Sequence, residues 1–150
     1  MTTTLDNPRA LLDLIGSELG HTDWREITQE QVNRFADATG DHQWIHTDPV
    51  RAVEGPFGTA IAHGYLTLAL TPIALAEVLT IEQLGATLNY GANKVRFPAP
   101  VPVAAKLRAT VTLTAAVEKP AGIEAVFTLT YEIQGGTRPV CVAEVVVVYR

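Results

Sequence analysis

The second half of the chain alternates between apolar and polar residues. Between Ala105 and Leu113 every second side chain is apolar, and the positions between them are Lys, Arg or Thr. A period of two is typical of a half-buried strand. The pattern predicts four strands, at residues 86–97, 103–117, 123–133 and 140–149. Short turns between consecutive strands favour an antiparallel sheet, with the β-branched run 140–149 near its centre.

The first half carries helical patterns instead. Apolar residues at helical spacing predict a helix from Asn7 to Leu19. A second helix is expected from Thr28 to Thr39, because Thr28 and Gln31 fit a capping box and Gly40 suits the C-terminal end. Pro49 favours the start of a short helix that runs to Val53.

The most apolar segment runs from Ile61 to Leu79. It is apolar nearly all round, so we expect a long helix wrapped by other structure, with a kink at Pro72. His63 and Glu77 within it argue against a membrane span. One long helix followed by a run of strands predicts an α+β fold in which a curved antiparallel sheet surrounds the helix.

Composition agrees with one globular domain that covers residues 1–150. The chain has 150 residues, of which 47% are hydrophobic and 18% charged. A net charge of -5 argues against a general nucleic-acid binder. Cys141 is the only cysteine, and the N-terminus shows no signal peptide, so we expect a cytoplasmic protein.

Asp41 and His46 stand out in the polar loop between the second and third expected helices. One bend could bring both side chains to a shared water, and histidine titrates near neutrality. By spacing alone, Asp41 is more often a turn residue. His42, His46 and Asp48 are metal-ligand types, but their spacing matches no familiar zinc pattern and we expect no metal.

Gly64 opens the apolar helix, next to His63. First-turn N–H groups lack partners within a helix, so they could stabilise a thioester oxygen that approaches the bare glycine. Alternatively, Gly64 only permits tight packing of the helix. His63 is more often a hydrogen-bonded structural histidine than a catalyst.

The segment from Asn89 to Phe97 offers polar groups on a strand. Lys94 and Arg96 are two residues apart and therefore share one face, where two cations could hold phosphates. A solvated strand face is the ordinary alternative.

Together these elements resemble a known family. The segment FADATGDHQWIHTDPVRA resembles the signature of the MaoC-like, (R)-specific enoyl-CoA hydratases, in which a Gly-Asp precedes a His five residues after the Asp. AHGYLTLAL resembles the start of that family's central helix, and NYGANKVRFPAPVPV the strand and loop that follow. Gln43 and Trp44 replace the common Asn-Pro, as in a subgroup with NodN-like proteins and related mycobacterial hydratases.

The resemblance implies the hot dog fold, a homodimer joined through sheet edges, and activity in fatty acid metabolism. It implies a lyase that adds water to trans-2-enoyl-CoA, with Asp41 and His46 as the catalytic pair and the Gly64 amide on the thioester oxygen. No cofactor is expected beyond the CoA thioester substrate. The candidate substrate contacts are Gln43, Trp44, His63, Asn89, Asn93, Lys94 and Arg96.

Two other functions remain open from the sequence. A hot dog acyl-CoA thioesterase would share the fold, but it usually places its carboxylate on the long helix, where Glu77 is the only acidic residue. A non-catalytic acyl-binding subunit would lack the pair, whereas this chain keeps both Asp41 and His46.

Overall fold

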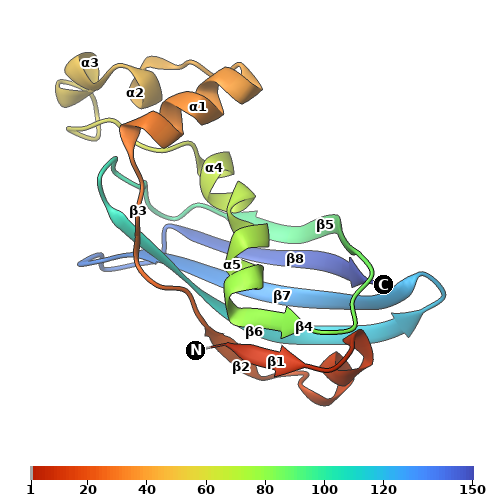
Figure 1. Cartoon of the computed structure of the whole chain (residues 1–150). Helices are drawn as coiled ribbons and strands as arrows, with labels where there is room; N and C mark the ends of the chain where they lie inside the picture. The colour runs from red at the N-terminus through yellow and green to blue at the C-terminus, as the bar shows by residue number, and fades with distance from the viewer. Residues whose placement is uncertain (1) are drawn as a thin grey trace.

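The computed structural model describes residues 2–150 and has two layers, a sheet and a pair of helices that crosses one of its faces (Figure 1). The main sheet has six strands in the order β2-β6-β7-β8-β5, with β3 also paired to β6, and its pairings are antiparallel. The helices are η1 (Pro8–Asp13, 3-10), α1 (Gln29–Thr39), α2 (Trp44–Thr47), α3 (Pro49–Val53), α4 (Gly64–Ala69) and α5 (Thr71–Val78). The strands are β1 (Thr3–Leu5), β2 (Glu18–His21), β3 (Arg25–Glu26), β4 (Leu79–Ile81), β5 (Thr87–Arg96), β6 (Lys106–Lys119), β7 (Gly122–Ile133) and β8 (Cys141–Tyr149).

The core lies between this sheet and the helices α4 and α5. Strand β7 lies in the middle of the sheet and buries every second side chain from Ile123 to Tyr131. Strand β6 does the same from Leu107 to Leu113, and a register shift follows Leu113. The predicted α+β architecture and the four strands of the second half are therefore confirmed, with β8 next to the central strand.

The predicted long helix is two helices. Leu70 joins α4 to α5, and Pro72 occupies the first turn of α5, where its missing N–H breaks no helical hydrogen bond. Ile61 and Ala62 are not helical, because Ala62 N donates to Val101 O at 2.8 Å and Ile61 bridges to Pro102. The helical layer thus begins at Gly64.

The prediction of a helix from Asn7 to Leu19 is wrong beyond Asp13. Gly16 has a φ of 89° and its N–H donates to Leu113 O at 2.7 Å, which turns the chain into β2. Leu19 is buried, as a helix would have buried it, but from a strand. The apolar spacing therefore fitted both structures.

The helices that precede the apolar segment match their signals. Thr28 caps α1 by accepting from Gln31 N at 3.1 Å, and Gly40 ends it with a φ of 84°. Pro49 begins α3, whose cap Asp48 accepts from Arg51 N at 3.0 Å. Helices α1, α2 and α3 lie together at one end of the sheet, beyond the start of α4 (Figure 1). Among the described residues, no helix has the length and apolar character needed to cross a bilayer.

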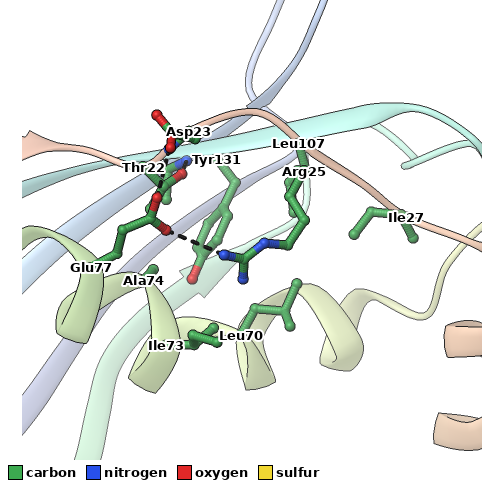
Figure 2. Close-up of a pocket in the computed structure, with 11 residues that line it drawn as sticks. Thr22, Asp23, Arg25, Ile27, Leu70, Ile73, Ala74, Glu77, Leu107 and Tyr131 are labelled. Carbon is green, nitrogen blue, oxygen red and sulfur yellow. Dashed lines mark hydrogen bonds and ion pairs between the residues drawn. The ribbon is translucent and has the colours of Figure 1, made fainter.

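Glu77, late in α5, is held by two contacts (Figure 2). Its Oε1 accepts from Asp23 N at 2.9 Å, and its Oε2 lies 3.5 Å from Arg25 Nη2. The neighbouring cavity measures about 20 Å³, which is room for a single water. Tyr131, which lines the same cavity, shares a hydrogen bond of 3.0 Å with Thr71.

Candidate active site

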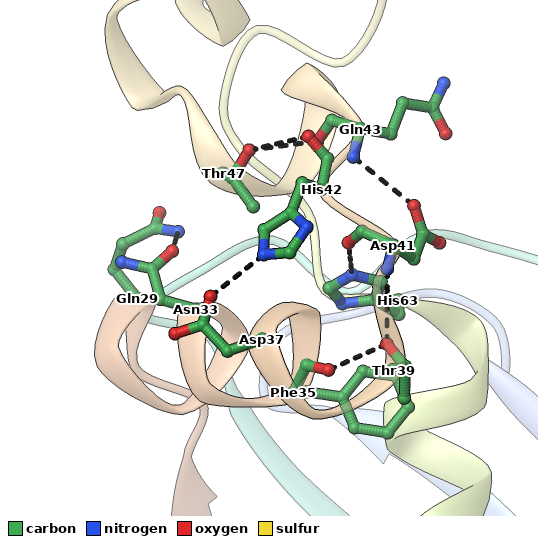
Figure 3. A network of polar contacts seen from close by, with 10 residues as sticks. All are labelled: Gln29, Asn33, Phe35, Asp37, Thr39, Asp41, His42, Gln43, Thr47 and His63. Carbon is green, nitrogen blue, oxygen red and sulfur yellow. Dashed lines mark hydrogen bonds and ion pairs between the residues drawn. The ribbon is translucent and has the colours of Figure 1, made fainter.

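The loop after α1 carries Asp41 between two short hydrogen-bonded turns. Asp41 Oδ1 accepts from Gln43 N at 3.3 Å, and Asp41 N donates to Thr39 Oγ1 at 3.4 Å (Figure 3). Thr47 Oγ1 donates to the carbonyls of His42 and Gln43, which ties α2 to the same loop. The carboxylate of Asp41 is exposed and has only this one weak acceptor contact among the described residues.

His46 lies in α2 and is 7% exposed. Its Nδ1 lies 2.7 Å from Ile61 O, and because a carbonyl can only accept, Nδ1 carries the proton. The Nε2 lone pair is then available as a base. Burial lowers the pKa of His46, and the neighbouring His63 lowers it further, while the Ile61 hydrogen bond and Asp41 act in the opposite direction. The lowered pKa favours the neutral imidazole at pH 7.

The structure brings Asp41 and His46 together with His63. One side-chain oxygen or nitrogen from each of the three lies within 4.8 Å of the others. His42 is not part of this cluster, since it is exposed and its Nε2 lies 2.9 Å from Asp37 Oδ1. That hydrogen bond raises the pKa of His42.

His63 lies behind the pair, and it is only 3% exposed. Its Nε2 donates to Asp41 O at 2.9 Å, and its ring stacks on His46 with centroids 3.9 Å apart and planes at 24° (Figure 3 shows the first contact). Asp41, His46 and His63 are also ligand types for a metal ion, so the expectation of no metal stays a prediction.

A cavity of about 440 Å³ opens between α2, the start of α4 and the loop after β5. Its described wall is mostly apolar and comprises His46, Phe57, Ile61, Ala62, Gly64, Thr67, Phe97, Pro98, Ala99, Pro100, Val101, Arg138 and Val140. Gly64 is the first residue of α4, and a Cβ there would come within 3.2 Å of the Phe97 ring. The glycine thus allows this ring to lie against the helix start, as the packing interpretation requires.

The site now has a neutral base, a carboxylate and an apolar cavity, and comparison with known proteins gives it a family. Residues 11–133 match the MaoC like domain. This chain belongs to the MaoC-like dehydratase family. It is 50% identical over 147 residues to 3-hydroxyacyl-thioester dehydratase Z of Mycobacterium tuberculosis, which covers 97% of each chain. It is 40% identical to Nodulation protein N of Rhizobium meliloti over 133 residues, or 87% of this chain and 83% of the other.

Solved structures of (R)-hydratases agree with the fold. The (R)-hydratase PhaJ1 of Pseudomonas aeruginosa superposes with a TM-score of 0.77 at 25% identity, and covers 96% of this chain and 86% of its own. The (R)-hydratase of A. caviae gives a TM-score of 0.74 at 26% identity, with 91% and 96% covered. The hot dog fold and the predicted subgroup are confirmed.

In this MaoC-like dehydratase the unusual Gln43 and Trp44 lie away from the cavity wall. Gln43 caps the N-terminus of α2, and its side chain points away from His63 (Figure 3). Trp44 packs under the Arg51 guanidinium, 4.2 Å from its ring centroid, and a Cβ on Gly55 would come within 2.9 Å of its ring. Trp44 thus joins α2 to α3, and a direct effect of either residue on substrate range stays a prediction.

The four predicted contacts on β5 are also outside this cavity. Lys94 and Arg96 pair with Glu144 and Val142, which flank the fully buried Ala143, so both cations lie on the outer face of the sheet. Asn93 Nδ2 donates to Glu144 Oε1 at 2.9 Å. Asn89 lines a separate cavity between α4–α5 and β5.

Arg138, the permanently charged residue in the described wall of the His46 cavity, was not predicted from the sequence. It lies in the turn between β7 and β8, and its side chain is exposed, while Val140 after it is buried and donates its N–H to Tyr131 O at 2.8 Å. The only sequence signal there was the turn at Gly135-Gly136, which says nothing about the helix that the turn faces.

Proposed function

We propose that this MaoC-like dehydratase catalyses the reversible addition of water to trans-2-enoyl thioesters, to give (R)-3-hydroxyacyl thioesters. The observation that carries this proposal is His46 with its Nδ1 engaged by Ile61 O and its Nε2 free, beside the Asp41 carboxylate, on a mostly apolar cavity. The names of the 50% identical dehydratase and of the (R)-hydratase structures support the reaction class and its stereochemistry.

The mechanism needs a water between Asp41 and His46. The pair removes one proton as the water oxygen bonds to C3, and returns one proton to C2, so the double bond gains one water in total. The first-turn N–H groups of α4, at Gly64, donate to the thioester oxygen and stabilise the negative charge that develops on it. Because removal and return of the proton need both groups, the pair acts as a unit.

The acyl chain would lie along the apolar wall that includes Phe57 and Phe97, and the charged end of the thioester carrier would leave the cavity beside Arg138. An exposed guanidinium suits phosphate groups. Lys94 and Arg96, on the outer face of the sheet, remain candidates for a phosphate bound across a dimer.

A homodimer joined at β5 completes the proposal. β5 is an edge strand that pairs only with β8 among the described strands, and it exposes Leu88 and Tyr90. A cavity of about 420 Å³ lies between it and α4–α5. Such an open apolar edge favours pairing with a second copy. Light scattering should give twice the chain mass, and Tyr90→Glu should shift it toward the monomer.

Glu77 gives little support to a thioesterase. Both of its oxygens are engaged with Asp23 and Arg25, and its cavity has room for one water.

The direct test of the proposed function follows enoyl absorbance with short, medium and long trans-2-enoyl-CoAs, with chiral analysis of the product and a parallel assay for free thiol. We expect hydration to the (R) product that persists after dialysis against EDTA. Thiol release without hydration would favour the thioesterase, and neither activity would favour a binding subunit.

A further inference from the structure

His63 occupies a buried position where an apolar aromatic side chain such as phenylalanine would also pack. It is 3% exposed, its ring centroid lies 4.9 Å from that of Phe35, and its Nδ1 is buried without a hydrogen-bond partner among the described residues. Leaving a buried polar atom unsatisfied costs stability that phenylalanine would not lose. Packing alone therefore does not account for a histidine at this position.

The other ring nitrogen of His63 holds the Asp41 loop. Nε2 donates to Asp41 O at 2.9 Å across 22 positions of sequence. The other hydrogen bonds of Asp41 among the described residues reach only Thr39 and Gln43, two positions away on each side. The hydrogen bond from His63 Nε2 therefore fixes Asp41 relative to the start of α4.

The same ring also supports His46. The two imidazoles stack at 3.9 Å, and His46 Nδ1 bonds to Ile61 O, two residues before His63. One short segment, residues 61–63, therefore orients the base through a carbonyl and a ring face, and orients the carboxylate's loop through Nε2. His63 does not line the cavity.

We propose that His63 is a positioning residue, which holds Asp41 and His46 at the separation that water activation needs. This inference rests on the proposed hydration of enoyl thioesters. His63 does not contact the substrate; it acts through the two residues that do.

Three variants separate this role from packing. His63→Phe keeps a ring against His46 and Phe35 but removes the donor to Asp41 O. His63→Gln places an amide nitrogen near the position of Nε2 and can restore the donor. His42→Phe is the matched control, because it makes the same change in the Asp41 loop at an exposed histidine whose ring, among the described residues, bonds to Asp37.

We expect His63→Phe to lower kcat about 100-fold with little change in KM, because a small misplacement of reacting groups has this cost. His63→Gln should recover part of the loss, and His42→Phe should retain the wild-type kcat. Wild-type kcat in folded His63→Phe would overturn the proposal, as would an equal loss in His42→Phe.

A second measurement does not depend on turnover. The backbone amide ¹H and ¹⁵N NMR shifts of His42, whose N–H shares a peptide unit with the Asp41 carbonyl, should move in His63→Phe and move back in His63→Gln, because that carbonyl loses and regains its donor. Unchanged shifts would overturn the positioning role even in an active enzyme. If the wild type hydrates no enoyl thioester but these shifts follow the donor, the proposed function fails while the structural link stands.

Discussion

Asp41 and Glu77 are two carboxylates near the α4–α5 helices, and they differ in what surrounds their oxygens. Glu77 accepts from a backbone N–H and faces Arg25, beside a cavity of about 20 Å³. Asp41 has one long contact to Gln43 N and clusters with His46, which lines a cavity of about 440 Å³, although Asp41 itself is not among the described residues of that wall. A carboxylate whose oxygens are engaged supports structure, whereas one with spare oxygens beside a base can exchange protons.

Replacing each carboxylate with the corresponding amide is the strongest test of this comparison. We expect Asp41→Asn to lower kcat/KM for crotonyl-CoA by about 10²–10⁴, because general acid–base groups contribute on this scale. Glu77→Gln should stay close to the wild type. His46→Gln should match Asp41→Asn, since the two act as a unit. Equal losses at Asp41 and Glu77 would reverse the assignment, provided that circular dichroism shows folded protein.

Crowding the helix start should have the next largest effect. Gly64→Ala places a Cβ 3.2 Å from the Phe97 ring, so we expect kcat/KM to fall about 100-fold through misplacement of the thioester. The double variant Gly64→Ala, Phe97→Leu relieves the ring contact. If it restores full activity, Gly64 serves packing; if activity stays low, the glycine is needed for the approach of the thioester to the α4 amides.

Arg138 should affect binding more than chemistry. We expect Arg138→Gln to raise KM for crotonyl-CoA about tenfold, since one charge-assisted contact is worth roughly 1.4 kcal/mol. KM for crotonyl-pantetheine, which lacks phosphates, should not change. Arg96→Gln is the matched control on the outer face of the sheet. A larger rise in KM for Arg96→Gln would place the phosphates on β5 instead.

The pH profile should follow from the lowered pKa of His46. The base is active when neutral, so kcat/KM should fall only as the pH drops through this lowered pKa, below the ordinary value of 6.5. The free energy of unfolding should also fall as the pH drops, because His46 binds its proton at a higher pH in the unfolded chain than in the folded one. The contribution of His46 to the free energy of unfolding is complete above pH 6.5 and is lost as the pH falls from 6.5 to the pKa in the folded protein. An acid limb above pH 7 would contradict this.

The smallest expected effect is on the free energy of unfolding, where Glu77 should matter more than Asp41. Glu77→Gln should lower the free energy of unfolding by about 1 kcal/mol through its weakened hydrogen bond to Asp23 N, while Asp41→Asn should change it less. Urea denaturation of both variants measures the difference. A larger loss for Asp41→Asn would mean that its loop stabilises the fold.

Local patterns predicted the sheet well, because a period of two fixes which side chains of β6 and β7 face the core whatever the neighbours are. The helix expected at 7–19 failed because Leu11 and Leu19 are buried in either structure, and the choice depends on pairing with β6, about 90 residues away. The four-residue α2 is too short to leave a periodic signal.

In the candidate site, too, local features could be predicted from the sequence and contacts between distant segments could not. Asp41 and His46 share one loop, so their spacing and the family resemblance were enough to pair them. The stacking of His63 on His46 and the approach of Arg138 to the cavity depend on contacts between distant segments, which a pattern along the chain does not report.

Ile61 shows how part of a catalytic arrangement can be invisible to mutagenesis. Its N–H donates to Ile45 O at 3.0 Å, and its carbonyl accepts from His46 Nδ1. Both contacts use the main chain, so any residue except proline at position 61 keeps them. A complete substitution scan would rank this position by the volume of its side chain alone, and the backbone group that sets the tautomer of the base would register as an ordinary core residue. Replacing the amide between residues 61 and 62 with an ester weakens this carbonyl as an acceptor and also removes the Ala62 N–H that donates to Val101 O. A changed pH profile of kcat/KM in the folded ester would therefore reveal the role of the carbonyl.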